Sequence, residues 1–313
     1  MSDPASPDSA TDEVALAVRA LMPGLKRQAM VAVSLITLAI VGGAVAALLV
    51  LNSGMKGEDR WKMALMVGIG VFLVVTWIFK WTVRKQEGQV MPILARAIGL
   101  NYAKDAKTFV KSLPRRLLPA RGIRSGEDHV HGPLGAHAIQ MAEVLVETGG
   151  KNSRTLFKGI VAQFPNRVAM PAFFVALEDK TRPGIFFGGD LSTEGLHHLR
   201  TVTGNGGRSY GVWTSWTAIE EQPSLSAVVD ILTRIEDHVG PGAELYAATS
   251  NGEEMHIALS HKRNLFHLGG LFPDENQLFR DVRAAMQDLT VPLTLAKTLI
   301  RAEETASAKV KGA

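Results

Sequence analysis

The sequence predicts an α+β soluble domain with a mainly antiparallel sheet, preceded by a transmembrane hairpin of two helices. Two uncharged apolar segments near the N-terminus, residues 30–51 and 63–79, predict the hairpin. Strand-like segments follow in adjacent groups, without strict alternation with helices, which favours antiparallel pairing. Three regions are expected: a disordered tail with a short amphipathic helix (1–29), the transmembrane hairpin (30–85) and a cytosolic α+β domain (86–313).

The N-terminal region is small, polar and proline-bearing over residues 1–11, which is typical of disorder. Thr11 is then expected to cap a short amphipathic helix that Pro23 and Gly24 end.

Both apolar segments are long enough to cross a bilayer. Residues 30–51 have no charge over 22 positions, and at about 1.5 Å per residue they cover the hydrocarbon core of roughly 30 Å. The 17 residues 63–79 reach the short end of the spanning range of about 17–25. Tryptophans that suit the headgroup layer accompany this second segment: Trp61, Trp77 and Trp81. The linker 52–62 is too short for a domain, so both long ends are expected on one side.

Small residues and charges refine the hairpin. Gly42 and Gly43 each precede an alanine by four positions, a spacing that allows close helix contact. The alternative is that glycine is simply common in membrane helices. Six basic residues flank the outer ends and three lie in the linker: Arg19, Lys26, Arg27, Lys80, Arg84 and Lys85 against Lys56, Arg60 and Lys62. The positive-inside rule therefore places both termini in the cytoplasm.

A basic stretch follows the second span. Residues 104–124 hold seven basic residues against Asp105 alone, a net charge of +6: Lys104, Lys107, Lys111, Arg115, Arg116, Arg121 and Arg124. Such a stretch can contact anionic lipid headgroups or a partner, at about 1 kcal/mol per charge near a lipid surface. The alternative is a solvated helix face plus a loop. Nucleic acid is not expected as a partner, because residues 86–313 carry a net charge of only +1.

Downstream, the periodicity predicts the elements of the soluble domain. Strands are expected at 137–146, 156–164, 172–177, 184–187, 210–216, 245–250, 253–260 and 264–272. Asn251 and Gly252 predict a tight hairpin, and a helix is expected over residues 225–235. A last helix starts at Asp274, with Pro292 interrupting it and the tail fraying from Glu303.

Three histidines lie in GEDHVHGPLGAHAIQ, residues 126–140. With Pro133 and Leu134 as the loop of a hairpin, His129 and His131 share one strand face and His137 lies on the other. A three-residue loop would instead bring His131 opposite His137. Two imidazoles lack the third protein ligand that a zinc site needs, so no metal is expected. His197 and His198 are adjacent, and neighbours in a helix diverge, so they cannot hold one ion together.

The sequence contains none of several common catalytic motifs. It has no cysteine, which excludes disulfides and thiolate sites, and it contains no HExxH, G-x-S-x-G or P-loop motif, so no cofactor is expected. A non-enzymatic binding or scaffold module is the first hypothesis, with the edge near His129 and His131 as a further contact. The alternative is a membrane-tethered hydrolase that uses Asp128 or Glu143 with His137.

The order of these features resembles the bacterial family called domain of unknown function 3137, which has two N-terminal spans and a soluble domain. The resemblance rests on SLPRRLLPARGIRSGEDHVHGPLGAHAIQMAEVLVETGGKNSRTLFKGIVAQFP and covers roughly residues 30–165, with the last third looser. The matching positions are Leu118, Glu127, Asp128, Val130, Gly132, Glu143, Phe157 and Gly159. The resemblance implies a bacterial inner-membrane protein and a LemA-type membrane protein as partner; it supplies no reaction, cofactor or catalytic residue.

Overall fold

The computed structural model describes residues 7–54, 56–135, 137–166, 170–181, 191–215, 223–239, 244–261 and 275–311. The chain divides into two compact units. The helical unit comprises Met1–Ala97 and Phe266–Ala285, and the sheet unit comprises Ile98–Leu265 and Met286–Ala313. Each unit is described by itself.

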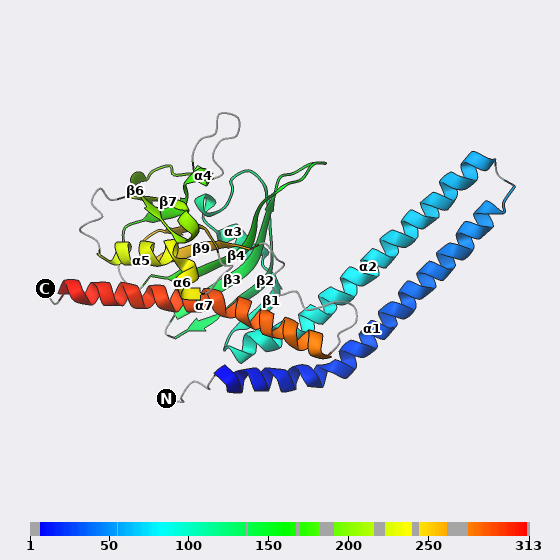
Figure 1. Ribbon diagram of the computed structural model, residues 1–313, viewed down its shortest axis with the longest axis horizontal. Helices are drawn as coiled ribbons and strands as arrows, with labels where there is room; N and C mark the ends of the chain where they lie inside the picture. Colours follow the sequence, from blue (N-terminus) through cyan, green and yellow to red (C-terminus); the bar gives the residue numbers. More distant parts are fainter. Residues whose placement is uncertain are drawn as a thin grey trace. The chain divides into compact units, whose positions relative to one another are not determined.

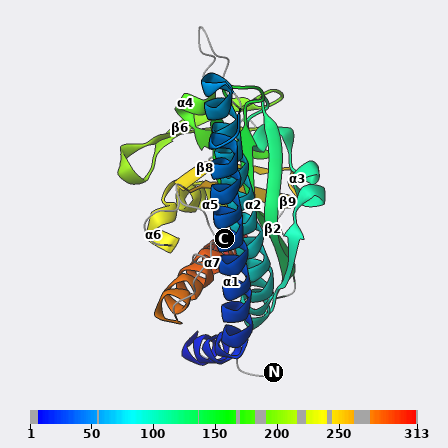
Figure 2. The ribbon, with the colours of Figure 1, turned by 90° about the vertical axis from the view of Figure 1, so that its right-hand side faces the viewer.

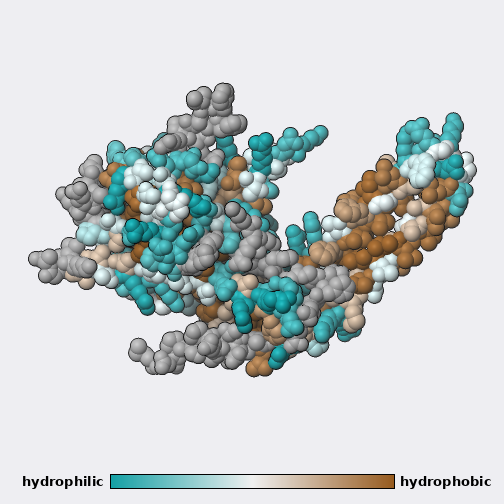
Figure 3. Space-filling model, in the orientation of Figure 1, coloured by the Kyte–Doolittle hydropathy of each residue, from teal (hydrophilic) through white to brown (hydrophobic). Residues whose placement is uncertain are grey.

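The helical unit contains two long helices that form a hairpin, α1 (Pro7–Leu51) and α2 (Gly57–Ala97) (Figure 1). At the turn, the guanidinium of Arg60 donates to the carbonyl of Leu51 at 3.1 Å. By length and composition both helices can cross a membrane. On the face that Figure 3 shows, apolar side chains cover most of the length of the hairpin, and hydrophilic residues gather at the turn between the helices.

The prediction of a first helix capped by Thr11 and ended by Pro23 and Gly24 is wrong, because α1 begins at Pro7 and runs through all three residues. A proline removes one helical hydrogen bond, and Figure 1 shows α1 as a bent helix, as expected when a proline lies inside it. Val18 and Leu25 are buried on either side of Pro23, so packing holds the helix together across the missing bond.

One of the two predicted close-contact glycines lies in the interface between α1 and α2. A Cβ added to Gly43 would overlap Cγ2 of Val71 on α2, whereas a Cβ on Gly42 would meet nothing within 4 Å. The small-residue prediction is therefore confirmed for Gly43, and Gly42 points away from the partner helix.

The sheet unit is built on a nine-stranded sheet of order β1-β2-β3-β4-β9-β8-β5-β7-β6. Every pairing is antiparallel, so the predicted α+β class with an antiparallel sheet is confirmed. The strands are β1 (Asn101–Asp105), β2 (Ile123–Leu134), β3 (His137–Glu147), β4 (Thr155–Pro165), β5 (Phe173–Leu177), β6 (His197–Thr203), β7 (Ser209–Thr214), β8 (Glu244–Ser250) and β9 (Glu254–Ser260).

Two strands were not predicted, and both lie at the edges of the sheet. They are β1, and β6, which places His197 and His198 on a strand and not in a helix. Neighbours on a strand point to opposite faces, so the two imidazoles still diverge. The strands expected at 184–187 and 264–272 lie outside the described residues.

Helices cover both faces of the sheet (Figure 2). On one face, α3 (Lys107–Ser112) and the 3₁₀ turn η1 (Arg115–Leu117) bury Phe109 and Leu117 in a core that includes Phe157, Phe174 and Trp213. Near β8 lie α5 (Pro223–Thr233) and α6 (Ile235–Val239). The remaining short elements are α4 (Glu178–Thr181) and the 3₁₀ turn η2 (Asn205–Gly207).

The last helix, α7 (Glu275–Lys311), is longer than predicted. Pro292 lies inside it without ending it, and the segment expected to fray from Glu303 is helical to Lys311. Leu289 and Ala296 are fully buried on either side of Pro292, and Glu303 is also fully buried, which explains why the helix persists.

The hairpin of β2 and β3 has a different register from the prediction. Leu134 pairs with His137, so the loop lies two residues later than Pro133 and Leu134. Gly135 has φ +65°, a left-handed conformation that glycine adopts without strain, and this favours the turn there. A bulge between Glu127 and Val130 adds one residue to β2, and Asp128 has φ 58° at that point.

Candidate anion-binding groove

Four of the seven basic residues in the predicted contact stretch line one open groove of about 700 Å³ in the sheet unit. Lys107 and Lys111 come from α3, Arg115 from η1 and Arg124 from β2. The other lining residues are Val110, Leu113, Ala120, Ser125 and Gly126. None of the described residues that line the groove is acidic, so its electrostatic potential favours an anion.

A close approach between α3 and β2 forms one wall of the groove. Gly126 makes this approach possible, because a Cβ at that position would overlap Cγ2 of Val110. Val110 and Phe109 are buried beneath α3, while Lys107 and Lys111, four residues apart, share its exposed face. The helix thus turns its apolar side to the sheet and its two ammonium groups to the groove.

Arg124 holds the opposite wall in place. Its Nη2 donates to the carbonyls of Arg115 and Leu118, both at 3.1 Å, and to the carbonyl of Pro119 at 3.4 Å. Burial lowers the pKa of Arg124, and the charge of Arg115 lowers it further. An arginine side chain stays protonated even so, so Arg124 both braces residues 115–119 and supplies a fixed positive charge.

The cations that remain available are on the exposed rim. Lys111 and Arg115 are exposed, and their side chains make no hydrogen bond or ion pair within the described part of the chain. Lys107 lies 3.4 Å from Asp105, but both side chains are mostly exposed, so this pair is weakly held. The backbone N–H of Lys107 also donates to Asp105, which lowers the pKa of Asp105.

The other three predicted contact residues lie outside the groove lining. The ammonium of Lys104 contacts Asp128 at 3.0 Å and Glu127 at 3.5 Å. Arg116 donates to the carbonyl of Glu194 at 3.4 Å, and Arg121 is exposed. The seven residues therefore do not form one surface: four converge, and three are placed elsewhere.

An exposed apolar residue accompanies the groove. Ile123 is 68% exposed, and it precedes Ser125 by two positions on β2, so both point to the same side of the strand. All other exposed large apolar side chains in the described ranges belong to α1 or α2. Sequence reasoning missed Ile123, although its place directly before Arg124 was a usable signal.

The residues of the hydrolase alternative do not converge. His137 and Glu143 are six residues apart on β3, which separates them by about 20 Å. Asp128 is buried beside β1, where it accepts hydrogen bonds from the hydroxyl of Tyr102 and the ammonium of Lys104. Burial raises the pKa of Asp128, against the hydrogen bonds, which lower it. The geometry provides no acid–base pair from these three residues.

The first two histidines share a strand face, as predicted. The rings of His129 and His131 stack with centroids 4.8 Å apart, and Phe109 stacks on His129 at 5.2 Å. Nε2 of His129 lies 3.2 Å from Oε1 of Gln140. Burial lowers the pKa of His129, and the charge of the neighbouring His131 lowers it further. No group of three His, Asp or Glu side chains in the described segments is placed to hold a metal.

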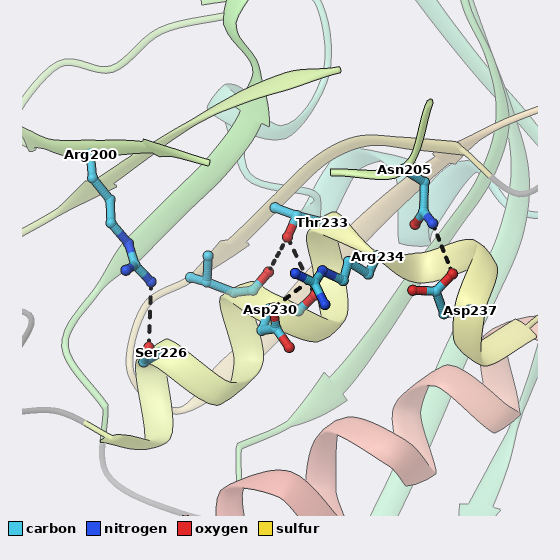
Figure 4. A network of polar contacts seen from close by, with 8 residues as sticks. Arg200, Asn205, Ser226, Asp230, Thr233, Arg234 and Asp237 are labelled. Carbon is cyan, nitrogen blue, oxygen red and sulfur yellow. Dashed lines mark hydrogen bonds and ion pairs between the residues drawn. The ribbon is translucent and has the colours of Figure 1, made fainter. Parts of the chain in front are cut away.

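A second groove, of about 520 Å³, lies between β6 and α5. Arg200 donates to Ser226 across it at 3.4 Å, and Asp230 supplies an opposite charge that also contacts Arg234 at 3.5 Å (Figure 4). Asn205 donates to Asp237 at 2.9 Å nearby (Figure 4). Because its charges are balanced, this groove does not select an anion as the first one does.

Comparison with known proteins gives little further information. No family model matches the chain, and no curated protein matches it. Among solved structures, the chain matches the crystal structure of the mycobacterial trehalose monomycolate transport factor A, TtfA. The match has 12% sequence identity and a TM-score of 0.35, and it covers 66% of this chain and 95% of that one. At this level of similarity it supports no statement about function.

Proposed function

We propose that the protein is a two-span protein of the bacterial inner membrane, with both termini in the cytoplasm. Its sheet unit then acts, without catalysis, as a module that docks on the anionic membrane surface through the cationic groove. The single observation that carries the docking function is the convergence of four cations on a groove whose described lining residues include no acidic side chain.

The spans are supported by the exposure of α1 and α2. Side chains such as Leu38 and Leu49, both 69% exposed, would be unfavourable in water and favourable in hydrocarbon. The charge distribution supports the orientation, because six basic residues flank the outer ends of the spans and three lie in the linker.

The connection to the second span supports the membrane surface as the ligand. The uncharged segment of α2 ends at Phe79, and 27 residues separate it from Lys107 at the start of α3. A connection of this length keeps the groove at a high effective concentration of lipid headgroups. Ile123 beside the groove strengthens this choice over an acidic protein, because an apolar side chain next to several cations is typical of surfaces that insert shallowly into anionic membranes.

A single-cysteine variant tests the groove directly. The natural chain has no cysteine, and Ser125 lines the groove, so Ser125→Cys introduces one unique label. The full chain is placed in nanodiscs of phosphatidylcholine with or without phosphatidylglycerol, and the rate of alkylation by a water-soluble maleimide is measured. We expect phosphatidylglycerol to slow alkylation. Arg115→Gln should weaken that protection by about fivefold, the equivalent of about 1 kcal/mol per cation near a charged surface.

Matched controls define what would contradict the proposal. Arg121→Gln removes the same charge from the same stretch but outside the groove, and Ser209→Cys places the label at an exposed position on β7. Arg121→Gln should leave the protection of Ser125→Cys by phosphatidylglycerol unchanged. Alkylation of Ser209→Cys should proceed at the same rate with and without phosphatidylglycerol. Equal loss of protection in Arg115→Gln and Arg121→Gln would refute the groove, and protection by an acidic peptide alone would make it a protein site. Labelling of Ser125→Cys in intact spheroplasts would refute the orientation.

The resemblance to domain of unknown function 3137 proteins and the LemA-type partner remain proposals. They rest on the order of sequence features between residues 30 and 165. Co-purification of a LemA-type protein with the detergent-solubilised full chain would support this partner. Failure of the two proteins to co-purify from a strain that expresses both would count against it.

A further inference from the structure

A small cavity lies within the helical unit, between α1 and α2. It has a volume of about 150 Å³ and is lined by Arg27, Gln28 and Val31 from α1 and by Trp81, Thr82 and Lys85 from α2. At roughly 30 Å³ per water molecule, it has room for about five waters, enough for one phosphate group but not for a whole lipid.

The cavity is equipped for an anion. Two of the described lining residues are cationic and none is acidic. Nζ of Lys85 lies over the ring of Trp81, 5.2 Å from its centroid, so the indole holds the ammonium at the cavity wall. Arg27 is exposed and makes no hydrogen bond or ion pair within the described ranges, so its guanidinium is available for two oxygens of one phosphate.

Two polar side chains of the cavity wall are held in place within the helical unit. Nε2 of Gln28 donates to Oε1 of Gln89 at 3.3 Å, which links α1 to α2. The hydroxyl of Thr82 donates to the carbonyl of Ile78 at 2.9 Å. The two cations are therefore the polar groups of the lining that a ligand can recruit.

The cavity lies where the polar base of the hairpin gives way to its apolar surface. Trp77 and Trp81 stack with centroids 6.4 Å apart, and both are well exposed at the level of the cavity. Val31, 53% exposed, lies at the start of the uncharged segment of α1. Tryptophans prefer the headgroup layer, so in a bilayer the cavity would face phosphates on one side and acyl chains on the other.

We propose that this cavity binds the phosphate of an anionic phospholipid, such as phosphatidylglycerol. Arg27 and Lys85 contact the phosphate oxygens, and Val31 and Trp81 contact the acyl region. This site rests on the proposed two-span arrangement, but it is separate from the groove of the sheet unit.

Native mass spectrometry of the full chain in detergent tests the site. Phosphatidylglycerol, phosphatidylcholine and inorganic phosphate are each titrated into the protein. We expect one phosphatidylglycerol to be retained at least tenfold more strongly than phosphatidylcholine, a difference of about 1.4 kcal/mol. Both lipids present a phosphate, but phosphatidylcholine also carries a choline cation, which cancels its net charge and is repelled by Arg27 and Lys85. Inorganic phosphate should not displace it, because phosphate alone gains nothing from the apolar contacts.

Charge-matched double variants decide the outcome. Arg27→Gln with Lys85→Gln should abolish the preference, whereas Lys80→Gln with Arg84→Gln removes the same charge from exposed positions outside the cavity and should preserve it. Arg115→Gln, in the groove, should also preserve it. Equal loss in both double variants, or displacement by inorganic phosphate, would overturn the site. A chain that stays soluble without detergent would instead refute the proposed spans, which separates the two failures.

Discussion

The helical unit and the sheet unit place the same residue types in opposite settings. Phe72 on α2 is 68% exposed, whereas Phe174 on β5 is fully buried. Among the described residues, exposed large apolar side chains belong to α1 and α2, with Ile123 as the exception. This difference is what the proposed membrane location of α1 and α2 predicts: a sheet in water must bury its apolar face, whereas a helix in hydrocarbon needs no such cover.

Truncating one phenylalanine in each unit gives the largest expected contrast. Phe174→Ala removes a buried ring from the sheet core and should destabilise the sheet unit by about 3–5 kcal/mol. Phe72→Ala removes a ring that packs against little protein, so it should change stability far less. Thermal unfolding of the full chain in detergent, followed by near-ultraviolet circular dichroism, measures both. Equal destabilisation by the two substitutions would mean that the outer surface of α2 is buried against protein, and the contrast between the units would collapse.

A pair of adjacent glycines sharpens the comparison inside the helical unit. Gly43→Val should separate α1 from α2 by overpacking against Val71, at a cost of about 1–3 kcal/mol. Gly42→Val adds the same side chain where nothing lies within 4 Å, so it serves as the matched control. Hydrogen exchange of α1 and α2 amides in nanodiscs should rise for the first variant only. A similar rise in both variants would indicate that valine acts through helix propensity and not through the interface.

The sequence was sufficient for the features that depend on one long stretch of chain. Length and absence of charge predicted the helices around residues 30–51 and 63–79, and period-two alternation predicted most strands of the sheet. Pro23 and Pro292 misled the prediction of helix ends, because a local break in hydrogen bonding is overridden where the flanking turns are buried.

The features that depend on contacts distant in sequence could not be predicted. The edge strand β1 reads NYAKD, without apolar alternation, and it is a strand because Asn101 pairs with His131 thirty residues later. The basic residues of the groove were identified by charge alone. Which of them converge was not predictable, because it depends on the packing of α3 against Gly126 on β2.

Lowering the pH is expected to destabilise the sheet unit more than the helical unit, and this is the smallest of the three predicted contrasts. His256 on β9 is buried, and burial lowers its pKa, while Glu254 partly opposes this. A histidine with a lowered folded pKa contributes stability that is present above its unfolded pKa of about 6.5 and is lost as pH falls through the folded pKa. The sheet unit should therefore unfold at a lower temperature at pH about 5.5 than at about 7.5, on either side of that unfolded value.

His256→Gln should reduce this pH dependence, because the substituted side chain does not titrate, while His129, whose pKa burial also lowers, retains its part. Amides of α1 and α2 should show no matching change, because these helices contain no histidine. Hydrogen exchange at both pH values, corrected for the intrinsic rate, separates the two units in one experiment. If α1 and α2 loosened with acid as much as the strands do, the two units would not respond independently to their own ionisable groups.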